Sequence, residues 1–461
     1  MKKLLLLLLF TCCTACYIHS QVATLTPLLE LDGAAITSIS ENGEWACGAA
    51  QNNADNAGYT SNASKWNLKT GERIYLVSEE ESEFQSDAFC ITNDGTLVGG
   101  QYLFEPAYHI NGEWHTLSLP KGYTRGEVRG IAIVGSDTIL VGRLFDGEGY
   151  VKVQSAKWVN GEFQKIVNLI PREYQYNEDK RMANQITGIS QDGRIMLGAI
   201  DPMTWPLRKP FIIKDSVFTL LDIENRTEFE KFHANFDFFK EEKLSHDGKF
   251  IALTFFANMH IPCTYSVEDD IFTIIQEAPF ETGCKAIDAK GNAYYAGPVT
   301  TGVDRKSYVT IDNKATCIDS ILLNKFGITQ EQINATCQDP DLTGSIRYIY
   351  DVASDGKTII GSAGYGIGGY NWVLHLPYTL FEDVPDAIEN IEYNNNIAFY
   401  NNQQINILGK ANYIEIFNIN GQLIESMPVE NSIVQANLQQ GIYLIKIYNQ
   451  NQIITNKIIV K

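Results

Sequence analysis

A degenerate unit recurs seven times along this chain, and the repetition constrains its fold more than any other feature. Each copy reads as an apolar strand, a turn of the Asp-Gly or Asn-Gly type, and a second apolar strand that ends in a small residue. The copies begin at Ile36, Ala88, Val128, Ile186, Glu242, Cys284 and Ile349. Their turn glycines can supply the positive φ of a tight hairpin: Gly43, Gly95, Gly135, Gly193, Gly248, Gly291 and Gly356. The sequence therefore predicts seven similar β-hairpins.

A second, aromatic-rich hairpin follows each copy, for example SKWNLKTGERIYLV after the first and AKWVNGEFQKI after the third. Two hairpins give four antiparallel strands per unit, and four-stranded units of roughly 40 to 65 residues are typical of a β-propeller. The last unit lacks a clear fourth strand, whereas residues 24–31 precede the first copy without a hairpin of their own. Because closing the ring removes exposed strand edges, we expect residues 24–31 to complete the last blade.

Residues 21–381 are thus predicted to form an all-β, seven-bladed β-propeller, with six or eight blades as alternatives. This region resembles extracellular β-propeller repeat proteins, whose unit pairs an I-S-x-D-G-x-x-I-x-G hairpin with a W-x-x-G hairpin. The resemblance implies the fold but no particular activity, because propellers include enzymes, lectins and scaffolds.

The composition changes after Phe381. Residues 382–396 are rich in Asp, Glu and Asn, which predicts a linker, and short alternating strands over residues 397–461 predict a small Ig-like β-sandwich. Three elements of this domain, residues 414–422 (IEIFNINGQ), 438–443 (LQQGIY) and 457–461 (KIIVK), stand in order at its end.

These three elements resemble the type A C-terminal sorting domain of the type IX secretion system of Bacteroidetes-group bacteria. The family's opening Tyr-Pro-Asn-Pro turn is replaced by Tyr400-Asn401-Asn402, which leaves the start of the domain less sharply defined. The resemblance implies the type IX secretion machinery as a partner, and a cell-surface or secreted location after passage through the periplasm. An accessory β-domain that stays on the protein is the alternative. The sorting-signal residues that the resemblance implies are Gly421, Gly441, Tyr443, Lys457 and Lys461.

Residues 1–20 are predicted to be a signal peptide, because Lys2 and Lys3 precede a short apolar core. Cleavage is expected near Ser20, and Cys16 leaves lipidation as an alternative. No later stretch reaches the roughly 18 to 20 apolar residues of a transmembrane helix, so no transmembrane segment is predicted.

The formal net charge is −19. A strongly acidic surface repels phosphate backbones, which argues against nucleic acid as a partner. Cys317 and Cys337 bracket one insertion that a disulfide could close in an oxidising compartment, and the other cysteines outside the signal read as buried thiols. No HExxH or DxDxDG spacing occurs, so we assign neither metal nor cofactor. A short helix is expected over residues 329–335, capped by Thr329 with Gln332.

Ligands of propellers usually enter at the face formed by the loops between second and third strands. These loops are predicted to be long and to carry aromatic and basic side chains, which suit a glycan or protein ligand. Packing between blades is the alternative for each of them. The candidate ligand-binding residues are Tyr59, Arg143, Tyr150, Trp205, Arg208 and Tyr365.

Three functions remain open on the sequence. The first is a non-catalytic binding module, and no catalytic residue is assigned because no nucleophile motif such as GxSxG is present. The second is an extracellular glycan-degrading enzyme, which would need two carboxylates from separate blades facing each other across the channel. The third is a structural surface component without a small-molecule site.

Overall fold

The chain divides into two compact units in the computed structural model, one ending at Glu382 and the other comprising Asp383–Lys461. The structure describes residues 23–460, apart from residues 29–34, 52–60, 79–84, 147–151, 177–181, 203–206, 224–225, 231–236, 258, 280, 298–304, 313, 338–343, 364–369, 383–397, 402, 408–410, 419–420, 430–431 and 450–452. The predicted signal peptide, with Cys16, lies outside these described residues. Within them, no helix is long and apolar enough to cross a membrane.

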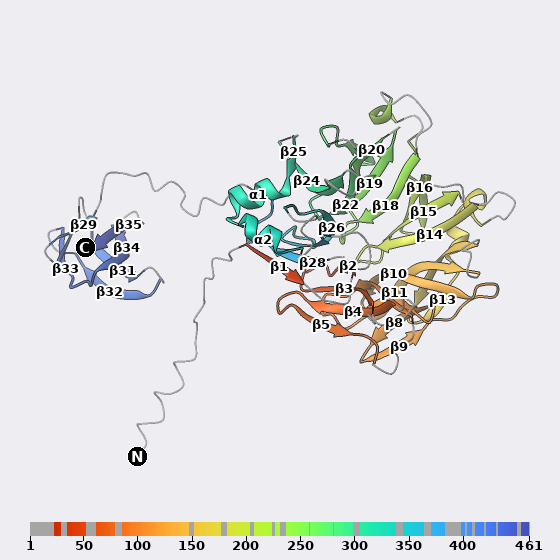
Figure 1. Cartoon of the computed structure of the whole chain (residues 1–461), viewed down its shortest axis with the longest axis horizontal. Helices are drawn as coiled ribbons and strands as arrows, with labels where there is room; N and C mark the ends of the chain where they lie inside the picture. Colours follow the sequence, from red (N-terminus) through yellow and green to blue (C-terminus); the bar gives the residue numbers. More distant parts are fainter. Residues whose placement is uncertain are drawn as a thin grey trace, which may run out of the picture. The chain divides into compact units, whose positions relative to one another are not determined.

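Seven four-stranded antiparallel blades make up the first unit and follow one another round a ring (Figure 1). The first is β2 (Ala35–Ile39), β3 (Trp45–Gln51), β4 (Ser61–Asn67) and β5 (Glu72–Tyr75). The second is β6 (Ser86–Ile91), β7 (Val98–Tyr102), β8 (Glu105–Ile110) and β9 (Glu113–Thr116). The third is β10 (Arg125–Val134), β11 (Asp137–Phe145), β12 (Val153–Val159) and β13 (Glu162–Gln164).

The fourth and fifth blades are joined into one eight-stranded sheet, because β16 also pairs with β18. The fourth is β14 (Met182–Ile189), β15 (Ile195–Pro202), β16 (Leu207–Lys214) and β17 (Val217–Leu220). The fifth is β18 (Asp237–Leu244), β19 (Phe250–Phe256), β20 (His260–Ser266) and β21 (Ile271–Ile274). Short 3-10 turns precede them: η2 (Ile166–Leu169), η3 (Arg172–Tyr174) and η4 (Thr227–Phe229).

The last two blades complete the ring. The sixth is β22 (Gly283–Ile287), β23 (Ala293–Gly297), β24 (Lys306–Ile311) and β25 (Lys314–Cys317). The seventh contains β26 (Tyr348–Val352), β27 (Thr358–Ser362), β28 (Asn371–His375) and, as its outermost strand, β1 (Thr24–Leu28).

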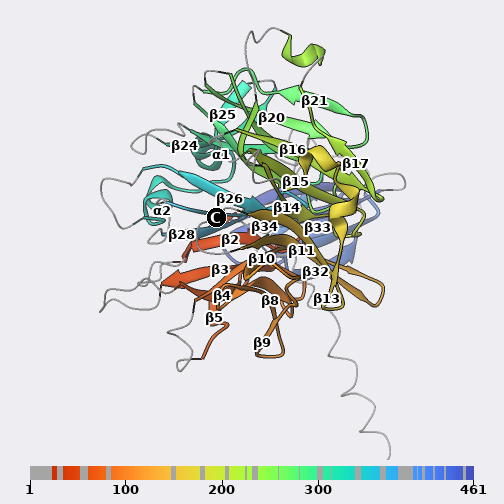
Figure 2. The same ribbon diagram turned by 90° about the vertical axis from the view of Figure 1, so that its right-hand side faces the viewer.

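The pairing of β1 with β28 confirms that the N-terminal segment completes the last blade. Thr24 lies opposite His375, and Leu28 lies opposite Asn371. The inner strand β2 of the first blade contacts β26 and β27 of the last, and Figure 2 shows β2 beside β28 and β26 from a second side. The propeller therefore has seven blades, as predicted, and not six or eight.

A tryptophan in the third strand fills three of the blades, at the same register position in the first and third and two residues earlier, opposite Gly361, in the seventh. Trp66, Trp158 and Trp372 are fully buried. The aromatic-rich second hairpin seen in the sequence therefore reflects the packing between neighbouring blades, which needs large apolar side chains.

The inner strands share an irregularity that the repeat does not reveal. In β10, Val128 lies opposite Gly142 and Gly130 lies opposite Val141, so Arg129 is an extra residue. Equivalent shifts occur in β2, β6, β14, β22 and β26. Such a β-bulge bends its strand and redirects the side chain of the extra residue.

The bulge explains why so many repeats end in glycine. A Cβ on Gly142 would lie 1.9 Å from the carbonyl oxygen of Glu127, and one on Gly361 would lie 1.9 Å from that of Tyr348. The inner strand thus presses its main chain against the second strand at this point. In the second blade the equivalent residue is Gly100, one position after the glycine that ends the repeat in the sequence.

Two helices lie in the insertion between β25 and β26: α1 (Ile318–Lys325) and α2 (Gln330–Asn334). The predicted capping box is present, because Thr329 and Gln332 each bind the other's backbone N–H. Helix α1 was not predicted. It buries Ile318, Ile321 and Leu322 in the core of the last blades, so it packs as part of the ring.

The disulfide that Cys317 and Cys337 could form is not present in the structure, in which both residues are thiols. Cys317 forms the N-cap of α1, and its Sγ lies 3.6 Å from Oδ2 of Asp319 in the first turn. Cys337 follows α2 and is buried. The two helices order this segment instead, and the start of α1 turns the Cys317 thiol toward its own helix.

The second unit is a small β-sandwich. One sheet contains β29 (Ala398–Asn401), β30 (Gln404–Ile407) and β33 (Ile433–Gln435). The other, in the order β32-β31-β34-β35, contains β31 (Tyr413–Asn418), β32 (Leu423–Pro428), β34 (Gly441–Tyr448) and β35 (Ile453–Val460). Both sheets contribute to one core, with Ile405 and Val434 from the first and Ile414, Ile416 and Ile445 from the second.

The residues of the predicted sorting signal lie in and around this second sheet. Gly421 has φ +75° in the turn before β32, where a side chain would strain the backbone. Gly441 begins β34, and the Tyr443 hydroxyl donates to the Gln439 carbonyl at 3.0 Å. Lys457 lies on β35, and Lys461 lies outside the described residues.

Candidate functional site in the central channel

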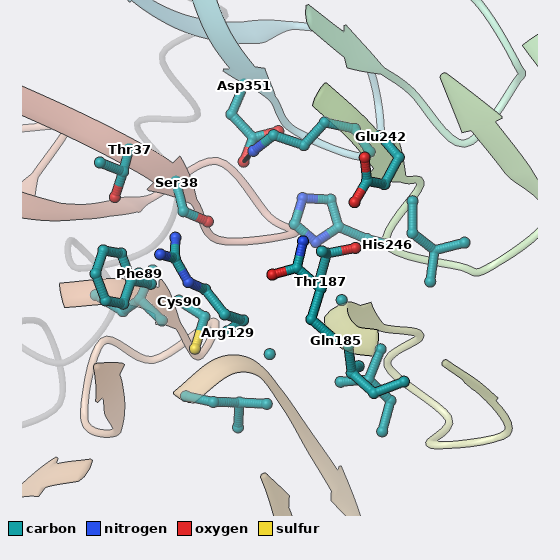
Figure 3. A pocket seen from close by; sticks show the side chains of 18 of the residues that line it. Thr37, Ser38, Phe89, Cys90, Arg129, Gln185, Thr187, Glu242, His246 and Asp351 are labelled. Atoms are coloured by element: carbon teal, nitrogen blue, oxygen red, sulfur yellow. Dashed lines mark ion pairs between the residues drawn. The ribbon is translucent and has the colours of Figure 1, made fainter. Parts of the chain in front are cut away.

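A cavity of about 320 Å³ lies where the inner strands of the propeller meet. Six of the seven blades contribute to its wall, chiefly through β2, β6, β10, β14, β18 and β26. Figure 3 shows the side chains of Arg129, Glu242, His246 and Asp351 around the same space. The polar and charged wall residues are Thr37, Ser38, Arg129, Arg143, Gln185, Thr187, Arg208, Glu242, Lys243, His246 and Asp351.

The bulges of the inner strands supply part of this wall. The extra residues of the first four blades are Thr37, Phe89, Arg129 and Thr187, and all four line the cavity. In each of these four blades the bulge thus contributes one side chain to the channel wall, so variation at that repeat position changes the chemistry of the channel without changing the blade.

Two arginines of the third blade share one carboxylate. Nε of Arg129 lies 2.7 Å and Nε of Arg143 lies 2.9 Å from the same oxygen, Oε2 of Glu127. Arg143 also donates from Nη1 to the amide oxygen of Gln185 at 2.7 Å, which ties the third blade to the fourth. Arg129 stacks on the ring of Phe89, 3.7 Å from its centre.

The buried carboxylate of Glu127 is held in its charged form by these partners. Burial by itself works to raise its pKa, but the guanidinium groups of Arg129 and Arg143 outweigh that effect and lower the pKa of Glu127 below its usual value. The carboxylate therefore serves to orient the two arginines in the cavity wall.

Two further ion pairs lie on the opposite side of the cavity. Arg208 Nη1 is 3.5 Å from Oε1 of Glu242, and Lys243 Nζ is 3.7 Å from Oδ2 of Asp351. Arg208 reaches the channel from a third strand because Leu207 and Arg208 of β16 pair with the inner strand β18. The wall thus alternates cations and carboxylates from different blades.

A second, more apolar cavity of about 530 Å³ lies toward the turns of the first hairpins. It shares Ile91, Ile131, Ile189 and His246 with the first. His246 follows β18 and lines both cavities.

The structure brings together two of the six predicted ligand-binding residues. Arg143 and Arg208 both line the channel cavity. Tyr59, Tyr150, Trp205 and Tyr365 lie outside the described residues, so their proposed role stays a prediction.

The sequence reasoning missed several residues of the wall, notably Arg129, Glu242 and Asp351 on inner strands and His246 in the turn after β18. A signal was available, because these residues are polar at repeat positions close to the turn, where a strand buried on both faces is ordinarily apolar. Among the described residues, no group of three or more His, Cys, Asp or Glu side chains could hold a metal ion.

Comparison with known families identifies the second unit. Residues 390–461 match the family described as the secretion system C-terminal sorting domain. The C-terminal domain is therefore a type IX sorting domain, and the chain is exported to the cell surface or the medium. A search of curated proteins finds no match to the chain.

Several solved structures are similar to the propeller at low identity. PorZ, a surface component of the type IX secretion system of Porphyromonas gingivalis, is 11% identical, with 92% of this chain and 59% of that chain covered and a TM-score of 0.44. An oligogalacturonate lyase from Vibrio parahaemolyticus is 11% identical, with 78% and 94% covered and a TM-score of 0.46. TolB from Acinetobacter baumannii is 12% identical, with 59% and 62% covered and a TM-score of 0.38. This chain thus spans less than two thirds of the PorZ and TolB chains, and likenesses at these scores carry no argument about its function.

Proposed function

We propose that this exported propeller protein is a non-catalytic binding module that holds a glycan in its central cavity. The observation that carries the proposal is the composition of the cavity wall, in which hydroxyl, amide, guanidinium and carboxylate groups from five blades face about 320 Å³ of space. A sugar needs donors and acceptors on several sides, and a few well-placed polar groups in a preformed cavity provide orientation and specificity. Export to the surface or medium would bring such a module into contact with extracellular glycans.

The surroundings of the two carboxylates favour binding over catalysis. Glycosidases commonly use a carboxylic acid whose pKa is raised by an apolar pocket, together with a second carboxylate. Here Glu242 lies beside Arg208, and Asp351 lies beside Lys243 and accepts the backbone N–H of Ile39 at 3.3 Å. Each carboxylate thus has a structural partner within the wall.

A glycan-degrading enzyme is the second candidate function, because two carboxylates from separate blades line the cavity. Glu242 and Asp351 come from the fifth and seventh blades and line one cavity with His246. This is the arrangement of carboxylates from separate blades that an enzyme of this kind would need.

A glycan array probed with the mature chain tests the proposal, with the Thr187→Phe variant to fill the cavity. Thr219→Phe on the outer strand β17 is the matched control, because Thr219 is exposed and far from the wall residues in sequence. We expect the wild-type chain and Thr219→Phe to bind the same saccharide, Thr187→Phe to lose it, and no new reducing ends to form.

Failure of the wild-type chain to bind any saccharide would reject the proposal, as would equal binding by Thr187→Phe. Release of new reducing ends that stops in Glu242→Gln or Asp351→Asn would favour the enzyme instead.

A further inference from the structure

The cavity wall is basic within a strongly acidic protein. Arg129, Arg143, Arg208 and Lys243 line it, against the carboxylates of Glu242, Asp351 and, behind the two arginines, Glu127. The chain as a whole has a formal net charge of −19. A local excess of positive charge in such a chain is a specific feature of this chamber and attracts ligands of opposite sign.

The excess charge is concentrated at Arg129 and Arg143. Both guanidinium groups contact one oxygen of Glu127, so a single negative charge is shared between two positive ones. Glu127 is buried and its pKa is lowered, so it stays ionised and contributes one negative charge against the two positive ones.

Donors of both arginines remain directed to the cavity. An arginine carries five N–H donors on three nitrogens. In the described part of the chain, Arg129 uses Nε and Nη2 on Glu127, whereas Arg143 uses Nε on Glu127 and Nη1 on Gln185. The two side chains are 30% and 23% exposed and both line the cavity, so part of each remains accessible to a ligand there.

The arginines are also held rigidly, which reduces the entropy lost on binding. Phe89 lies under the Arg129 guanidinium, and Gln185 fixes that of Arg143. Ser38 and Thr187 place hydroxyl groups on the same wall, as Figure 3 shows. Guanidinium groups bind planar carboxylates and sulfates through paired hydrogen bonds, while the hydroxyl groups suit the ring oxygens and hydroxyls of a sugar.

We infer that the glycan held in this cavity is acidic and that Arg129 and Arg143 bind its carboxylate or sulfate group. This inference rests on the proposed function and adds the chemical class of the ligand. It assigns to Arg129 and Arg143 the recognition of the anion, and to Glu127 the positioning of both arginines.

Calorimetry with the full mature chain tests the inference. Three probes of equal length separate the sources of charge: an oligomer of a hexuronic acid, a sulfated oligosaccharide, and a neutral glucan. We expect at least one acidic probe to bind and the neutral one not to, with affinity that falls as salt is raised because ions screen the charges of the wall.

Two variants change the affinity in opposite directions. Arg129→Met can keep an apolar contact with Phe89 but removes the charge and the donors, so we expect a loss of affinity of about ten- to a hundredfold, the usual worth of a hydrogen bond to a charged group. Glu127→Gln removes the shared negative charge and should bind the acidic probe more tightly. Arg194→Met is the matched control, since Arg194 pairs with Asp215 at an exposed turn and should leave binding unchanged.

The outcomes separate this inference from the proposed function. If the neutral glucan bound as well as the acidic probes, or if Arg129→Met and Glu127→Gln both left binding unchanged while remaining folded, the cavity would bind glycans but the acidic class would be wrong. If none of the three oligosaccharides bound to any variant in the calorimetry, and the wild-type chain also bound nothing on the glycan array, the proposed function itself would be wrong.

Discussion

Gly142 connects the repeat sequence to the chemistry of the channel. The bulge of β10 brings the Glu127 carbonyl to 1.9 Å from the position that a Cβ at Gly142 would occupy. We expect Gly142→Ala to lower the free energy of unfolding by roughly 3 kcal/mol, since the contact is with main chain that cannot move aside. It should also weaken ligand binding, because the same bulge positions Arg129.

Chemical denaturation of Gly142→Ala beside Gly188→Ala measures this effect. Gly188 also lies on an inner strand, but the nearest atom to its added Cβ is 3.8 Å away, an ordinary contact. Equal stability of the two variants would show that the close approach does not control the bulge.

His109 makes the second blade sensitive to acid. Burial, and to a smaller degree the charge of Lys65, lowers the pKa of His109 to about 4. In the unfolded chain a histidine has a pKa near 6.5. As the pH falls, the unfolded state therefore binds a proton at His109 before the folded state does. The contribution of neutral His109 to the free energy of unfolding is fully present above about pH 6.5 and is lost as the pH falls toward 4.

Replacement of His109 by Gln should make stability less dependent on pH in this window. We expect the wild-type chain to lose about 1 kcal/mol more than His109→Gln between pH 7 and pH 4.5. Thermal melts across this range test it, with His115→Gln as the control because His115 is exposed in the same blade. Parallel pH curves for wild type and His109→Gln would contradict the assignment.

Strand β1 holds the ring closed. Its Leu25 and Leu28 are both 6% exposed, and its five residues pair with β28. We expect deletion of residues 21–28 to lower the free energy of unfolding by roughly 4 kcal/mol or more, because two buried leucines and a strand's hydrogen bonds are lost. A synthetic peptide of residues 22–30 should restore part of the loss when it is added in excess, which a melting curve would report. An unchanged melting temperature after deletion would mean that the last blade is stable with three strands.

Most strands could be predicted from the sequence because alternation and turn glycines are local signals. Helix α2 could be predicted for the same reason, since Thr329 and Gln332 form its capping box. Helix α1 was missed because its three buried apolar residues look like the end of a strand followed by a loop. The spacing of Cys317 and Cys337 left a disulfide open for the same reason. Without the position of α1, the sequence does not show that the Cys317 thiol lies next to Asp319 in the first turn of that helix.

The cavity wall could be predicted only in part. The register shift in β10 that makes Arg129 an extra residue depends on pairing across the hairpin, which the sequence of one strand does not contain. Arg208 enters the channel only because β16 pairs with β18 of the next blade. Arg143 lines the cavity from within β11, whereas the sequence placed it in the loop between the second and third strands, and its role in ligand binding stays a prediction.

The propeller and the sorting domain have separable tasks. They are two compact units with the boundary after Glu382. We expect a chain truncated after Glu382 to keep the melting temperature of the propeller and its affinity for ligand, but to accumulate in the periplasm because residues 390–461 carry the sorting signal. Cell fractionation with intact-mass analysis in the native host tests this, with the full chain as the control. Normal arrival of the truncated chain at the surface would show that another segment directs export.

The pairing of β1 with β28 also sets an order in time. The first strand of the propeller to be synthesised finds its partner only when residues 371–375 have been made, so every shorter chain leaves the ring open. The sorting domain follows that partner strand in the sequence. A chain that displays the export signal has therefore always received the segment that closes the ring, and a chain interrupted earlier lacks both. The order of the elements thus limits export to chains that are long enough to be finished.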